Sequence, residues 1–288
     1  MQWVQVLMTF LRFVLPMWLL AHLRITSLIH GWLIDAMDNG AVVGTETVTS
    51  SIAARNRSLL HPTLTATREL FEHIESYMKR RVELSILLYC LGQVRPDQLR
   101  EEKVLSLESR GRNYLGMQQL LVLAREAAAD IAALPRFRQV AGGKDIRTFL
   151  TREGEQFPAW RNPLMRGQGK NIDEFFRVLY RAEEGDEAGG YLLIPEGRGG
   201  GRGFRVFPGQ LLLKTITYTA ARCKWSRQRG GAVGKLVLQD VEDRFGQYGV
   251  DFSSAADARP LLMRELQALG LLNGSPDAGS SVPVTCPF

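Results

Sequence analysis

Apolar residues recur at three- and four-residue spacing along most of the first 134 positions, which is the periodicity of helices that bury one face. Met1 to Ala21 is apolar almost throughout, and a second amphipathic run from Leu23 to Met37 follows directly. We expect two helices joined by a tight turn and buried against each other or against a partner subunit. Asp38-Asn39-Gly40 then predicts a turn, and residues 41–51 predict a loop or a short strand.

Three further helices complete this half of the chain. The first runs from about Pro62 to Gly92 and is apolar on all sides in its second half, which indicates burial. Another begins near Pro96, and an alanine- and leucine-rich helix occupies Tyr114 to Leu134. Residues 1–134 are therefore predicted to form one all-helical bundle.

The composition changes at Pro135, and residues 135–170 are predicted to be an irregular basic linker in which cations and aromatic side chains alternate. Such a mixture suits a nucleic-acid surface, because cations neutralise phosphates and flat rings stack on bases. It equally suits a linker whose aromatic rings pack onto the bundle while its arginines stay solvated. Both interpretations remain open at this point.

Residues 171–207 are predicted to form a helix and a β-hairpin. Asn171 has the position of a helix cap, and residues 191–194 and 204–207 are typical strands. The glycine-rich tip between them links two strands, so it lacks the strand-to-helix context of a nucleotide site. Arg198 and Arg202 on this tip are candidates for contact with a nucleic-acid backbone.

The last segment, residues 208–288, is predicted to be a winged-helix domain. Helices are expected from Pro208 to about Cys223, from Lys235 to about Gly246, and from the cap Asp257 to Gly270, with Pro260 in the first turn of the third. Residues 271–272 and 282–284 would form the wing. The fold class is thus mainly α, with a helical bundle, a small hairpin-containing region and a winged helix.

A DNA-binding winged helix would place its third helix in the major groove and hold the backbone with neighbouring cations. The candidate DNA-binding residues here are Arg259, Arg264 and Gln267 on the third helix and Arg222, Lys224, Arg227 and Arg229 after the first. Glu265 and Met263 dilute this surface, and the wing carries Asp277 and no cation. A winged helix that docks another protein explains the pattern equally well.

The composition limits the possible classes of protein but does not indicate a reaction or a cofactor. The chain has 288 residues with 45% hydrophobic and 23% charged, which excludes intrinsic disorder, and its net charge of +6 permits a polyanionic partner. Three separated cysteines and four histidines form no metal-binding spacing, and no nucleophile motif is present. We expect no catalytic residue, metal or cofactor, and no small-molecule substrate, although an enzyme without a familiar motif remains an alternative.

The apolar N-terminal run raises the alternative of a membrane anchor. Arg12 lies inside it and Pro16 interrupts it, and a charge at the centre of a span costs about 2.5–3.5 kcal/mol. A buried helix and a cytoplasmic location are therefore favoured over insertion of residues 1–21.

The C-terminal quarter resembles the G component of bacterial phosphorothioation-dependent restriction systems. Tyr248-Gly249-Val250-Asp251-Phe252, the leucine-rich helix and the segment from Leu271 to Val282 carry the resemblance. The resemblance implies an accessory subunit that works beside an ATPase in a phage-defence complex, and it carries over no catalytic residue. More broadly, we expect a complex for phage defence or DNA maintenance whose other subunits include an ATPase or a nuclease. The expected function is a non-catalytic subunit that docks proteins through the bundle and contacts double-stranded DNA or a partner through the winged helix.

Overall fold

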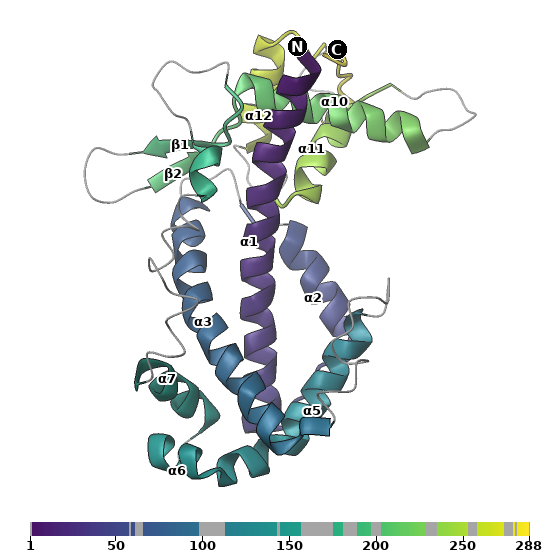
Figure 1. Ribbon diagram of the computed structural model, residues 1–288. Coiled ribbons are helices and arrows are strands. Elements are labelled where there is room, and N and C mark those ends of the chain that lie inside the picture. The colour runs from purple at the N-terminus through teal and green to yellow at the C-terminus, as the bar shows by residue number, and fades with distance from the viewer. Residues whose placement is uncertain are drawn as a thin grey trace. The chain divides into compact units, whose positions relative to one another are not determined.

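The computed structural model describes residues 2–57, 59–60, 66–97, 113–142, 145–156, 175–180, 189–196, 203–227, 235–252, 258–273, 279 and 281–287. The mainly helical class is confirmed (Figure 1). The elements are α1 (Gln2–Asn39), α2 (Thr45–Arg57), α3 (Ala66–Val94), α5 (Asn113–Ala133), α6 (Pro135–Ala141), α7 (Ile146–Gln156), the 3₁₀ helix η1 (Arg177–Leu179), β1 (Leu193–Glu196), β2 (Gly203–Val206), α10 (Gln210–Arg227), α11 (Leu238–Gln247) and α12 (Ala258–Ala268).

The chain folds into two compact units that are discontinuous in sequence. The terminal unit comprises residues 1–21, 55–72 and 171–288, and the central unit comprises residues 22–54 and 73–170. Helices α1 and α3 each contribute residues to both units. The sequence-based boundaries after residues 134, 170 and 207 stay predictions.

The prediction of two N-terminal helices is wrong, since α1 is a single helix of 38 residues with Pro16 inside it. No glycine, asparagine or aspartate lies near Ala21 to provide a turn. Proline removes one helical hydrogen bond, but its neighbours Phe13, Met17 and Leu20 are buried and hold the helix in place. The predicted turn follows the helix at Gly40, whose φ of 68° is left-handed.

Residues 41–51 form neither a strand nor a loop throughout, because α2 begins at Thr45. The hydroxyl groups of Thr49 and Ser50 donate to the carbonyls of Thr45 and Thr47, so these residues are satisfied within the helix. Val48 on α2 is fully buried. Burial thus overrides the weak helix propensity of threonine and serine.

The expected irregular linker after Pro135 contains two helices. Pro135 lies in the first turn of α6, and Gly142 ends that helix with a φ of 62°. The carboxylate of Asp145 then accepts a hydrogen bond of 2.7 Å from the Thr148 N–H and caps α7. Because basic residues recur through this segment, the sequence analysis did not recognise these caps. It also missed the short apolar faces of the helices that begin and end at them.

The central unit is built around one apolar core. The second part of α1 packs with α3, α5, α6 and α7, and the buried side chains of this core include Leu33, Ile34, Leu87, Ile131 and Phe149. Phe137 and Phe149 are buried with ring centroids 4.9 Å apart. These two aromatic residues of the predicted basic linker are therefore core residues that cannot stack on bases, whereas Phe157 and Trp160 lie outside the described residues.

In the terminal unit, the predicted hairpin is confirmed as the antiparallel pair β1–β2, with Leu193 opposite Val206. The inner face of α1 packs on the end of α11. Phe13 meets Phe245 and Tyr248 edge-on, with centroids 6.1 and 5.5 Å apart. Leu59 and Leu60 donate backbone hydrogen bonds to Gly249.

Helices α10, α11 and α12 lie close to where the sequence predicted them, although α10 continues past the expected end near Cys223 to Arg227. Pro260 is in the first turn of α12, and Gly270 follows the helix with a φ of 67°. Short antiparallel bridges join Val237 to Pro283 and Leu272 to Val284.

Candidate docking surface and the predicted nucleic-acid residues

One face of α1 exposes a continuous stripe of large apolar side chains. Five of its residues are separated alternately by four and three positions, and two more residues lie beside these five. The members, here called the α1 stripe, are Trp3, Val4, Leu7, Met8, Leu11, Leu15 and Trp18, with exposures from 38% for Leu11 to 64% for Val4 and Trp18. The opposite face, with Val6, Phe13 and Met17, is buried in the terminal unit.

The stripe is large for an exposed apolar surface. A tryptophan side chain offers roughly 200 Å², and Trp3 and Trp18 are 60% and 64% exposed. These two residues alone therefore leave on the order of 250 Å² in water, before the five aliphatic members are added. Patches beyond a few hundred Å² mark interaction sites in soluble proteins.

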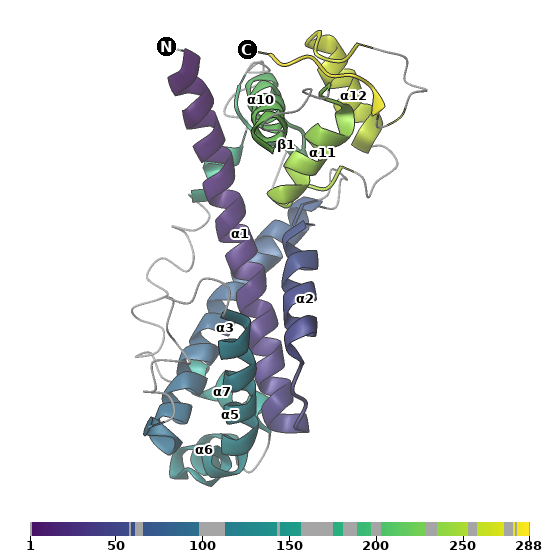
Figure 2. The same cartoon turned by 90° about the vertical axis from the view of Figure 1, so that its right-hand side faces the viewer.

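The stripe continues onto α10. The ring of Trp3 meets Tyr218 edge-on with centroids 5.1 Å apart, and Figure 2 shows the first turns of α1 beside α10. Tyr218, Arg222 and Trp225 follow at spacings of four and three and so share one face of α10. Arg222 is exposed and Trp225 is 36% exposed.

Arg12 borders the stripe, four residues after Met8 and three before Leu15. It is exposed, and within the described part of the chain it has no ion pair. The first acidic residue in the sequence is Asp35. This surface is therefore apolar with a cationic edge.

Two predicted DNA-binding cations are engaged inside the terminal unit. Lys224 Nζ lies 2.6 Å from the Asp240 carboxylate and also donates to the Lys235 carbonyl. Arg259 donates two hydrogen bonds of 2.6 Å to Glu242, which is 5% exposed, and this contact raises the pKa of Arg259. Both side chains join helices, which removes much of their capacity to meet phosphates.

The remaining predicted residues are scattered. Arg264 and Gln267 are exposed on α12, and the Arg264 guanidinium lies 3.5 Å from Glu265. Arg227 is the last residue of α10, and Arg229, Arg198 and Arg202 lie outside the described residues. Among the described members, only Arg222 is both exposed and located on the α10 face that meets the stripe.

Arg244, which sequence reasoning passed over, also has a structural role. Its guanidinium stacks 5.0 Å from the Tyr248 ring and 5.9 Å from Phe10, and it donates to Thr219 and Gln247. The exposure of the stripe was missed too, because an apolar sequence does not reveal which helix face is covered. The signal available in the sequence was the alternating spacing of four and three residues between its members, which is typical of a helix face that packs on another helix.

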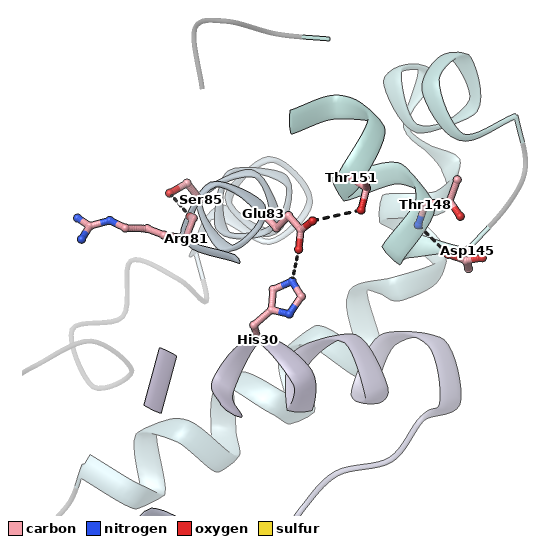
Figure 3. Close-up of polar contacts among 7 residues, drawn as sticks. All are labelled: His30, Arg81, Glu83, Ser85, Asp145, Thr148 and Thr151. Atoms are coloured by element: carbon pink, nitrogen blue, oxygen red, sulfur yellow. Dashed lines mark hydrogen bonds and ion pairs between the residues drawn. The ribbon is translucent and has the colours of Figure 1, made fainter. Parts of the chain in front are cut away.

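The central unit holds a buried polar cluster (Figure 3). His30 Nε2 lies 2.7 Å from the Glu83 carboxylate, whose other oxygen accepts a 3.1 Å hydrogen bond from Thr151. Burial by itself raises the pKa of Glu83, but His30, Thr151 and the charge of Lys79 together hold that pKa below its usual value. The cluster joins α1, α3 and α7, and the side chains of His30 and Glu83 are almost fully buried.

Two further features of the central unit carry little chemistry. Burial raises the pKa of the Cys90 thiol to about 11, so it is unreactive near neutral pH. A surface cavity of about 670 Å³ is lined partly by Asp35, Asp38 and Asp145. Within the described residues, no group of three or more His, Cys, Asp or Glu side chains has an arrangement that could hold a metal ion.

Comparison with protein-family models, with curated proteins and with solved structures finds no match. The resemblance of the C-terminal quarter to the restriction component therefore stays a hypothesis carried by the residues quoted for it.

Proposed function

We propose that this protein is a non-catalytic subunit of a multiprotein complex and holds a partner protein on the α1 stripe. The single observation that carries the proposal is the exposure of seven large apolar side chains on one face of a helix whose other face is buried. Burying such a face against another protein releases roughly 25 cal/mol for each Å² of apolar surface. The stripe thus offers a substantial driving force for association.

We further propose that residues 208–288 form a winged helix. The order of α10, the segment at Val237, α11, α12 and the segments at Leu272 and Val284 supports it. The antiparallel bridges from Val237 to Pro283 and from Leu272 to Val284 are those expected for strands around a wing. Residues 274–278, at the expected tip, lie outside the described residues.

The ion pairs of the proposed winged helix favour a role in protein assembly over a role in DNA recognition. Lys224 and Arg259 pair with Asp240 and Glu242, and α11 exposes Asp243 beside them. A phosphate backbone would meet this acidic residue as well as the remaining cations. A phage-defence or DNA-maintenance complex is the setting that the resemblance suggests, and a neighbouring ATPase or nuclease gene would favour it.

The test compares the full chain with a stripe variant, Met8→Gln/Leu15→Gln, in the cells that produce it. Both side chains are exposed, so the variant should fold. The wild-type protein is expected to sediment in a complex larger than 32.3 kDa and the variant as the free chain. Leu88→Gln, an exposed leucine of α3 outside the stripe, is the matched control. Unchanged sedimentation of the stripe variant would contradict the proposal.

A membrane-associated protein is the second candidate. Within the described residues, one helix, Trp3–Asn39, is long and apolar enough to cross a membrane. Membrane fractions washed at high salt and then at alkaline pH would retain an inserted chain. Release of the chain by these washes would remove this candidate.

A further inference from the structure

We infer that the partner segment is an amphipathic α-helix with acidic residues beside its apolar face, and that it lies along the α1 stripe and the adjoining face of α10. The inference rests on the proposed function, because it names the chemistry of the partner at the same surface. Its two parts, the helical form and the acidic edge, follow from separate observations.

The helical form follows from the spacing of the stripe. Val4, Met8, Leu11, Leu15 and Trp18 are separated by four, three, four and three residues, which is the spacing of a seam between two helices. A partner helix with the same spacing can insert its apolar side chains between these residues. Trp3 and Trp18 near the two ends supply the flat, wide contacts that dominate protein interfaces.

The acidic edge follows from charge. Arg12 flanks the stripe, and Arg222 lies one helical turn after Tyr218, which contacts Trp3. No acidic residue precedes Asp35 in the sequence, so α1 itself provides no counter-charge within that stretch. A carboxylate beside the apolar face of the partner would pair with either arginine, and such rim pairs fix orientation and speed association.

A second copy of the chain fits this surface less well. If two stripes packed antiparallel around a two-fold axis perpendicular to the helices, equivalent edges would meet, and Arg12 would approach Arg12 of the second copy. Like charges at a helix–helix edge are destabilising.

A lipid surface is also less suitable. Interfacial helices carry several lysines or arginines along their polar face, whereas the face of α1 opposite the stripe is buried in protein at Phe13, Met17 and Leu20. The only cation among residues 1–21 is Arg12.

The test measures binding of two labelled synthetic helical peptides to the purified full chain by fluorescence anisotropy. Both peptides carry leucines at alternating four- and three-residue spacing, and they differ only in having glutamate or lysine at the flanking positions. The glutamate peptide is expected to bind about tenfold more tightly at 50 mM salt, and high salt should reduce this preference. Arg12→Glu/Arg222→Glu should reverse it, and Trp18→Gln should weaken binding of both peptides.

Each alternative outcome is distinct. Equal binding of the two peptides, or tighter binding of the lysine peptide, would overturn the acidic edge while leaving the proposed docking function intact. Binding of neither peptide would overturn the inference. Sedimentation as a dimer that Trp18→Gln dissociates would then assign the stripe to a second copy. Stripe-dependent binding to phosphatidylglycerol vesicles would assign it to lipid. Failure of the proposed function is a different result, namely a stripe variant that still sediments in the native complex.

Discussion

The guanidinium of Arg259 and the carboxylate of Glu242 form a two-pronged ion pair, with both hydrogen bonds at 2.6 Å. The pair ties the start of α12 to α11 and provides a counter-charge for a carboxylate that is almost fully buried. An arginine placed on the third helix as a candidate for base contacts is thus also a structural residue.

Arg259→Met should lower the free energy of unfolding by about 1–2 kcal/mol, because Glu242 then stays buried without a counter-charge and Arg259 is itself partly exposed. Arg259→Lys should recover part of the loss, since lysine keeps the charge and loses the planar double contact. Urea denaturation measures both. Arg264→Met, at a side chain 71% exposed, is the control and should change stability by less than about 0.5 kcal/mol. A loss as large in Arg264→Met would contradict the assignment.

Substitutions of Lys224 and Arg222 should distinguish an effect on stability from an effect on DNA binding. Lys224→Met removes the 2.6 Å contact with Asp240 and should cost about 1 kcal/mol, whereas Arg222→Met should leave the free energy of unfolding nearly unchanged. Any affinity of the chain for duplex DNA should instead be changed by Arg222→Met. The slope of the log of this affinity against the log of salt concentration should be reduced by about one. Equal effects of both variants on stability would show that the Lys224–Asp240 pair contributes nothing.

The His30–Glu83 contact should make the central unit sensitive to acid. The pKa of Glu83 is lower in the folded chain than its ordinary value of 4.5. Its ionised form therefore stabilises the fold above about pH 4.5, and this contribution is lost as the pH falls through the lower, folded value. Glu83→Gln should destabilise the chain by about 2 kcal/mol at pH 7 and by much less at pH 3. Thermal melting at both pH values tests this, and an equal loss at both would contradict it.

Two glycines should respond in opposite directions to alanine. A Cβ at Gly209 would collide with the Gly189 carbonyl oxygen and lie 2.9 Å from the Tyr191 ring, whereas a Cβ at Gly246 meets nothing within 4 Å. Gly209→Ala should cost about 2 kcal/mol or more. Gly246→Ala lies in α11 and should stabilise by about 0.5–1 kcal/mol. Calorimetry of the two variants compares them directly, and a neutral Gly209→Ala would show that the backbone there moves readily.

Local signals predicted local structure well. Pro260 and Gly270 bracket α12, and the strands on either side of the glycine-rich tip pair as expected. These features depend on backbone chemistry that a few adjacent residues determine. The sequence analysis did not predict that α1 is continuous, because its apolar composition hid the absence of a turn signal. It also missed the helices after Pro135, because the basic residues of that segment hid their caps.

Contacts between distant residues could not be predicted in the same way. Nothing in the spacing around Phe13 identifies Phe245 as its neighbour, and nothing near Lys224 or Arg259 identifies Asp240 or Glu242. The exposed and buried faces of the first turns of α1 are almost equally apolar. Only packing distinguishes the face that forms the core from the face that forms the stripe, and packing depends on the whole chain.

The contact between Phe13 and Phe245 also has a consequence for biosynthesis. Phe13 is synthesised more than 200 residues before Phe245, the α11 residue that packs on its ring. Synthesis at about 5–20 residues per second leaves the apolar segment around Phe13 without this contact for roughly ten seconds or more. We expect such a nascent chain to depend on ribosome-associated chaperones, and co-expression of the proposed partner should raise the soluble yield.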